Sequence, residues 1–237
     1  MFEEGIMIMR PFQENPVSVT GMAYVVNGRC GAVGQKMSWS CQSPKDASRM
    51  LQSQGFIQEL PKNWGRFDAL SLTTLAAALW GCVDAGLPMA QGKRRIGIVG
   101  SNLEGSLDSN RVFFADYMDA GRKSARSNLF VYTLPTTPLA EVALFCGFTG
   151  PVWHQQQTCS GVGGLVSAGA LCASQDDIDA MLAVWAGSKE AVCFVLQKGK
   201  VKEIFSTLMI QERLEGMTAV GDILKALEVS FEHKGAV

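Results

Sequence analysis

One cysteine in the sequence has a neighbourhood suited to nucleophilic chemistry. Cys159 is followed by Ser160, and the charge-free segment 161–173 (GVGGLVSAGALCA) that comes next is expected to form a helix. A thiol at a helix N-terminus has a lowered pKa, because the helix dipole favours negative charge there. Cys159 is therefore a candidate for accepting an acyl group as a thioester.

Condensation at this thiol would also need a base or hydrogen-bond donors, and the sequence supplies few of them. The two histidines are His154 and His233. His154 lies five residues before Cys159, and an odd separation along a strand puts two side chains on opposite faces. His233 has no recognisable motif around it. We therefore expect Cys159 to be a buried thiol without a catalytic role, with acylation of Cys159 as the alternative.

The other residues of this kind have simpler interpretations. Asp176 and Asp177 are more typical of a solvated turn or a helix N-terminal charge than of a catalytic pair. The sequence contains no CxxC pair, no histidine cluster, no phosphate-binding loop and no dinucleotide fingerprint, so we expect neither a metal nor a cofactor. Six further cysteines have no motif around them and are expected to be small core residues: Cys30, Cys41, Cys82, Cys146, Cys172 and Cys193.

The composition is that of a globular protein. Of 237 residues, 47% are hydrophobic and 18% are charged, and the formal net charge is -1. This charge gives no basis for binding nucleic acid or an anionic membrane. No apolar run is long enough to span a bilayer, and the N-terminal one is too short for a signal peptide. Seven cysteines without paired spacing suit a reducing compartment, so we expect a cytoplasmic protein.

The hydrophobic pattern predicts strands that alternate with helices. Strands are expected at 16–26, 95–100, 152–157, 180–187, 191–197 and 200–209, and helices at 44–53, 69–85, 106–120, 138–146, 161–173 and 218–231, with a polar loop at 121–132. This order favours an α/β fold with a mixed sheet. No linker-like stretch interrupts it, so we expect one domain over residues 1–237, with a core at 16–210 and a helical tail at 211–237.

Several segments resemble β-ketoacyl synthases, in the same order along the chain. Residues 16–21 (PVSVTG) resemble their opening strand, 76–87 their first long helix, and 95–101 (RIGIVGS) the next strand with its glycine turn. The most specific match is the stretch FTGP at 148–151, followed eight residues after its proline by Cys159. Ketosynthases place their nucleophilic cysteine at that spacing. The match covers about residues 16–197.

The resemblance implies a thiolase-like α/β fold, with helices on both faces of a mixed sheet. Ketosynthases contain two such halves, and this chain resembles the first; the catalytic histidines of the family lie in the second. Gln157 also stands where the family usually has threonine. We therefore expect no condensing activity. The chain is similar to the half-length, chain-length-factor-like subunits of type II polyketide and aryl-polyene synthesis, which pair with a complete ketosynthase.

The resemblance also implies which surfaces meet that partner. The helix at 161–173 is sandwiched between two sheets in the family, so a partner or the tail helix must cover it here. Ketosynthases pair edge to edge through the strand before the cysteine, which here comprises Val152, Trp153, His154, Gln155, Gln156 and Gln157. In the segment that reaches across the dimer, Thr136, Thr137, Leu139, Val142 and Phe145 are expected to wall the partner's acyl tunnel.

Three functions stay open at this point. The first is a non-catalytic subunit that stabilises a full-length β-ketoacyl synthase and shapes its acyl tunnel in fatty acid or polyketide synthesis, with an acyl-carrier protein reached through that partner. The second is an acyltransferase or condensing enzyme, which an acyl adduct lost in Cys159→Ala would identify. The third is a homodimeric module that binds acyl chains without any synthase.

Overall fold

A single mixed sheet organises this computed structural model, which describes residues 17–26, 28–89, 92–156, 163–199, 214, 217 and 220–232. The strand order is β3-β2-β1-β7-β6-β4-β5, and β5 lies at one edge. The strands are β1 (Val17–Val26), β2 (Gly28–Ala32), β3 (Met37–Cys41), β4 (Ile96–Asn102), β5 (Val152–Gln156), β6 (Ala180–Ala186) and β7 (Ala191–Lys198).

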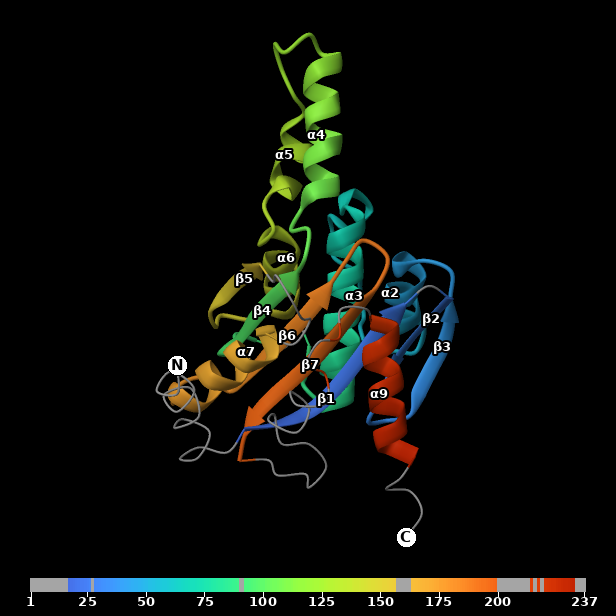
Figure 1. Cartoon of the computed structure of the whole chain (residues 1–237), viewed down its shortest axis with the longest axis vertical. Helices are drawn as coiled ribbons and strands as arrows, with labels where there is room; N and C mark the ends of the chain where they lie inside the picture. Colours follow the sequence, from blue (N-terminus) through green and yellow to red (C-terminus); the bar gives the residue numbers. More distant parts are fainter. Residues whose placement is uncertain are drawn as a thin grey trace.

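Helices cover both faces of the sheet, as predicted (Figure 1). One face carries α2 (Pro44–Ser53), α3 (Ala69–Ala85) and α6 (Thr137–Cys146), and the other carries α7 (Gly163–Ser174) and α9 (Val220–Glu232). A short helix, η1 (Trp64–Arg66), precedes α3. The helices α4 (Leu107–Asp119) and α5 (Ser127–Phe130), with η2 (Val131–Thr133), form an arm that projects beyond the sheet (Figure 1).

The strand directions define the end of the sheet at which a site can form. β4 runs parallel to both β5 and β6, whereas β7, β1, β2 and β3 continue the sheet with antiparallel pairs. The carboxyl ends of β4, β5 and β6 therefore meet at one edge of the molecule. In α/β sheets, ligands and partners commonly bind at this end of the strands.

The long helix α3 is the centre of the larger core. Its start is capped by Asp68, which accepts the Ser71 N–H at 2.8 Å, and it ends at Gly86 with a φ of 65°. Residues 70–84 are all buried, because the sheet, α2 and α6 surround the helix. Contact with β1 is close: a Cβ on Gly21 would lie 2.6 Å from the Ala85 nitrogen.

A buried carboxylate ties β1 and the β2–β3 turn to α3. Asp84 accepts the backbone N–H groups of Met22 at 2.7 Å, Gly34 at 3.0 Å and Gln35 at 2.8 Å. An amide has one acceptor oxygen, so Asp84→Asn should lower the free energy of unfolding by about 3 kcal/mol. Urea unfolding measures this change. The matched control is Asp176→Asn, at an exposed ion pair with Lys198; an equal loss in both variants would contradict the prediction.

One hairpin was missed from the sequence, one helical segment was assigned as a loop, and one predicted strand lies outside the described residues. The hairpin of β2 and β3 was not predicted, and the segment 121–132, predicted as a polar loop, contains α5 and the start of η2. The predicted strand at 200–209 lies outside the described residues.

Within the described ranges, no single helix is long and apolar enough to cross a membrane. The helical segments 127–133 and 137–146 together have the length and composition of a membrane span, but they are bent by 98° relative to each other.

Candidate functional site

The outer edge of β5 is the first element of the candidate site. The Ile98 N–H donates to the Pro151 carbonyl at 2.8 Å, and Ile98 lies opposite Val152 in the parallel ladder. Alternate residues of a strand direct their backbone groups to the same side, so Trp153 and Gln155 also face β4 with theirs. The N–H and C=O groups of Val152, His154 and Gln156 therefore point away from the sheet.

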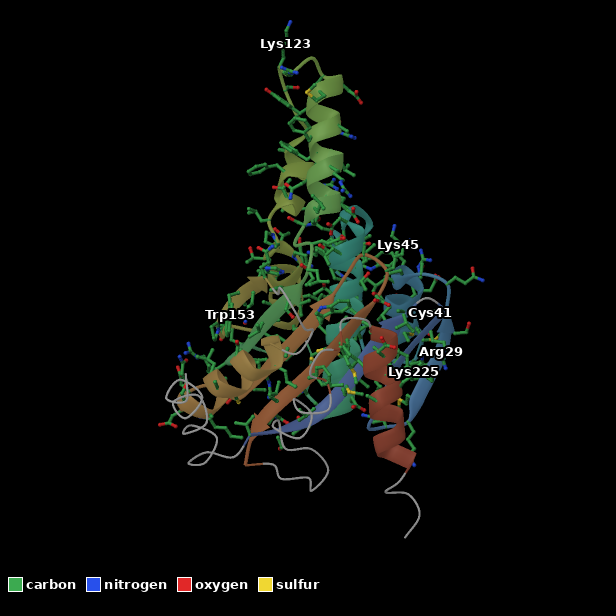
Figure 2. The ribbon with its side chains drawn as sticks, viewed as in Figure 1. Arg29, Cys41, Lys45, Lys123, Trp153 and Lys225 are labelled. Atoms are coloured by element: carbon green, nitrogen blue, oxygen red, sulfur yellow. The ribbon has the colours of Figure 1, made fainter. Side chains whose placement is uncertain are left out.

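The side chains of β5 divide between the two faces of the sheet. Trp153 packs against the hydrophobic cluster beneath α7 and is half-buried, and Figure 2 shows it at the β5 side of the molecule. Gln155 lies on the same face, where its Oε1 accepts the Ser167 hydroxyl of α7 at 2.8 Å. Val152 packs into the cluster around α3 and α6, and His154 follows on that face. Gln156 is exposed.

An amide connects the ends of the three parallel strands. The Nδ2 group of Asn102 donates to the carbonyl oxygens of Ala186 at 3.0 Å and Gly105 at 3.1 Å. This fixes the orientation of the amide, so its Oδ1 faces the Nε2 of His154 at 3.3 Å. His154 must then donate from Nε2. This linkage was not predicted from sequence, because Asn102 ends β4 without any motif around it.

Burial lowers the pKa of His154 from its ordinary value. The unfolded chain takes up this proton near pH 6.5 and the folded chain at lower pH, so stability falls as pH drops through that interval. His154→Gln keeps a donor for Asn102 and removes the titration. Between pH 7.5 and pH 5, the melting temperature of the wild type should fall further than that of this variant. The difference should be small, because the ring is half-buried. Equal losses in thermal scans would contradict the assignment.

The structure divides the residues predicted to wall a partner's tunnel. Leu139 and Val142 are 3% and 0% exposed and lie in the chain's own core, with Leu139 seated where a Cβ on Gly100 would clash. Thr137 is also buried and donates to the Val131 carbonyl at 2.6 Å. These three side chains cannot contact a second chain from there, so the prediction is corrected for them. Thr136 is exposed and Phe145 is half-buried.

Large apolar side chains are exposed on α6, which contacts β5, and at the base of the arm. Leu144 on α6 is 78% exposed, Phe130 54%, Leu134 51% and Val131 46%. Phe130 lies on α5, Val131 on η2 and Leu144 on α6, and Leu134 lies between η2 and α6. The helix α6 contacts both η2 and β5. Leu144 was missed because apolar residues occur all round α6, so the sequence does not show which of them face outward.

The helix α7 lies flat on the sheet and keeps one side partly open. A Cβ on Gly164 would come within 3.1 Å of the Ser101 hydroxyl, so glycine permits the close approach to β4. Leu165, Ala168 and Cys172 are buried against the sheet. On the outer side, Ser167, Ala170 and Leu171 are half-buried and Ser174 is exposed. The tail helix α9 packs on β1, and Figure 1 shows it apart from α7 rather than over it.

Thiol chemistry within the described residues is suppressed by burial. All six described cysteines are buried, which confirms the prediction that they are core residues. Burial raises the pKa of Cys82 to about 12 and that of Cys172 to about 11, so their thiolates are scarce at neutral pH. Cys159 and Gln157 lie outside the described residues. No group of three or more possible metal ligands gathers within the part of the chain that is described.

Comparison with known proteins identifies the fold. No family model and no curated protein matches the sequence. Among solved structures, the ishigamide ketosynthase/chain length factor matches with a TM-score of 0.57 and 13% identity, covering 78% of this chain and 58% of its own. The chain has the thiolase-like fold of the β-ketoacyl synthases. This confirms the predicted fold class and the resemblance on which it was based.

Two further ketosynthase structures give the same result. A β-ketoacyl synthase from Burkholderia phymatum STM815 matches with a TM-score of 0.52 and 16% identity, covering 79% of this chain and 60% of its own. The complex of a type II polyketide synthase acyl-carrier protein with its ketosynthase matches with a TM-score of 0.54 and 16% identity, over 79% and 63%. The chain thus spans about three fifths of the ketosynthase-fold structures that it matches.

Proposed function

We propose that this protein is a non-catalytic partner subunit of a full-length β-ketoacyl synthase. The observation that carries the proposal is the outer edge of β5, which pairs with no other strand among the described residues and from which the backbone groups of Val152, His154 and Gln156 point away from the sheet. An open strand edge of this kind pairs readily with a strand of another chain. Pairing with the matching strand of a synthase gives a pseudo-symmetric heterodimer with one continuous sheet.

Exposed apolar side chains on α6, which contacts β5, and at the base of the arm support this proposal. Leu144, Phe130, Leu134 and Val131 are all at least 46% exposed, and soluble proteins seldom leave much apolar surface uncovered unless a partner binds there. A partner strand on β5 would lie beside α6, which presents Leu144. The second surface is the outer side of α7, where small side chains allow a helix of the partner to approach closely.

The role proposed for this subunit needs shape rather than catalytic groups. The subunit stabilises the synthase and narrows the partner's acyl tunnel. The residues that line this tunnel are the exposed or half-buried Thr136, Leu144 and Phe145, and not the core residues of α6. The product is a fatty acid or a polyketide, an aryl polyene among them. An acyl-carrier protein would reach the pair through the synthase. Cys159 has no required part in this role.

Co-expression with the β-ketoacyl synthases of the same genome tests the proposal. One of them should co-purify with this chain at one to one, and light scattering should give the mass of a heterodimer. The isolated chain should self-associate, because its apolar residues around β5 stay uncovered. A monodisperse monomer at high concentration that binds no synthase would overturn the proposal. A homodimer carrying lipid, again without a synthase, would favour an acyl-chain-binding module instead.

A further inference from the structure

A cavity lies between the base of the arm and the body of the molecule. Its volume is about 780 Å³, which falls in the range of small-molecule sites. The start of α3, the loop after β4, the first turns of α4, a residue of α5 and the β6–β7 turn all contribute to it. It adjoins the carboxyl ends of β4 and β6, and β5 contributes no residue to it.

Apolar side chains from five elements form most of the cavity wall: Leu70, Leu103, Leu107, Val112, Leu129 and Trp185. Leu103 is 45% exposed, Leu107 40% and Val112 55%. These are large exposures for apolar residues, and all three side chains border this one space. Closing the cavity around an apolar molecule would remove that surface from water, which favours binding.

Several polar side chains in the cavity wall already have partners within the protein. Asn102 donates to two carbonyl groups and accepts from the Gly105 N–H. The Ser106 hydroxyl donates to the Thr133 carbonyl. Asp68 accepts the Ser71 N–H and the Ser109 hydroxyl. These paired groups offer a ligand few hydrogen bonds, so the part of the wall that they and the apolar side chains form favours a molecule with little polarity of its own.

Charge around the cavity disfavours an anion. Four carboxylates line it (Asp68, Glu104, Asp108 and Glu190), against the two lining cations Arg66 and Lys189; Asp108 is also paired with Arg111 at 3.4 Å, which leaves Glu104 and Glu190 as the main source of the excess. Tyr132 also lies in the wall: burial raises the pKa of its phenol, the nearby carboxylates Glu141 and Asp68 raise it further, and Arg66 acts the other way. Negative potential next to an apolar wall would repel a fatty carboxylate while leaving an uncharged chain unaffected.

We propose that this cavity binds an uncharged, largely apolar organic molecule and discriminates against its carboxylate counterpart. The wall supplies the affinity, and the excess of carboxylates supplies the discrimination. This site is separate from the β5 edge and does not depend on the partner proposed above.

Calorimetric titration of the full chain with two probes of equal chain length tests the proposal. 1-Decanol should bind at one site with saturation, and decanoate at pH 7 should bind at least about tenfold more weakly. Val112→Trp should lower decanol affinity at least about tenfold by filling the cavity, and its exposed position on α4 tolerates the larger ring. Phe114→Trp is the matched control, since Phe114 is 61% exposed on the same helix and does not line the cavity.

A second variant tests the electrostatic part independently of cavity shape. Glu104→Gln with Glu190→Gln should raise decanoate affinity several-fold and leave decanol affinity unchanged. Equal affinity for the two probes in wild type, no binding of decanol, or equal loss in the Val112 and Phe114 variants would overturn the proposal. The two proposals fail separately: Val112→Trp should still co-purify with a synthase, and a β5 variant should still bind decanol.

Discussion

Gln156→Pro should abolish co-purification with a β-ketoacyl synthase. The Gln156 N–H points away from β4, so proline removes a donor that the partner strand needs and places its ring in the path of that strand. Within its own sheet the substitution is mild, because an edge strand accepts proline where the N–H faces solvent. We expect a 10- to 100-fold loss of affinity, of which the lost hydrogen bond accounts for about 1 kcal/mol.

Gln156→Ala is the matched control for this variant. It shortens the same exposed side chain but keeps the N–H, so the complex should form with nearly wild-type affinity. Both variants should melt within a few degrees of wild type when isolated. Calorimetry measures the affinities. If the proline variant bound the synthase as tightly as wild type, β5 would not be the paired strand.

A double substitution, Leu134→Asp with Leu144→Asp, should also eliminate the complex. The two side chains are 51% and 78% exposed in the isolated chain, so the variant should fold normally. Burying two carboxylates under a partner costs several kcal/mol, which is enough to lower the affinity by more than a hundredfold. The isolated variant should also self-associate less than wild type, because the surface beside β5 becomes charged.

Phe114→Asp is the control for the double variant, because it places a carboxylate at an exposed apolar position on α4, away from β5. Lys123 lies at the tip of the same arm (Figure 2). This control should keep the synthase bound. Light scattering measures self-association and co-purification measures the complex. Equal effects of Phe114→Asp and the double variant would mean that the interface is not centred on β5.

Elements with local signals were predictable from the sequence. The helices predicted at 44–53 and 69–85 begin after the capping residues Ser43 and Asp68, and Gly86 and Gly147 end α3 and α6 in the left-handed conformation. The hairpin of β2 and β3 was missed because its segments, GRCGA and MSWSC, have glycine and serine where strands usually have β-branched residues. Pairing with β1, a tertiary effect, determines its structure.

The candidate site was predictable in its position and not in its detail. The strand before Cys159 was placed correctly, because β-ketoacyl synthases supply the order of elements. The outward face of α6 was assigned wrongly because every face of that helix carries apolar residues. The rotation of α6 about its own axis depends on Gly100, because the missing side chain of Gly100 leaves the space that Leu139 of α6 fills. Such a fit between distant segments has no signature in either one alone.

The helix α7 is less completely covered by the rest of the chain than the sequence analysis required. A charge-free helix was expected to need cover on every side, either from the tail or from a partner. The tail helix α9 packs on β1, where Val220 and Ile223 are buried. The outer side of α7 is left half-buried, and the small side chains of Ser167 and Ala170 limit the apolar surface exposed there.

Hydrogen–deuterium exchange at β5, with and without the bound synthase, tests the central claim most directly. If β5 pairs with a strand of the synthase, the amides of Val152, His154 and Gln156 should become strongly protected in the complex. The amides of Trp153 and Gln155, already directed toward β4, should change much less. A stable complex in which the exchange of Val152, His154 and Gln156 is unaltered would contradict the account.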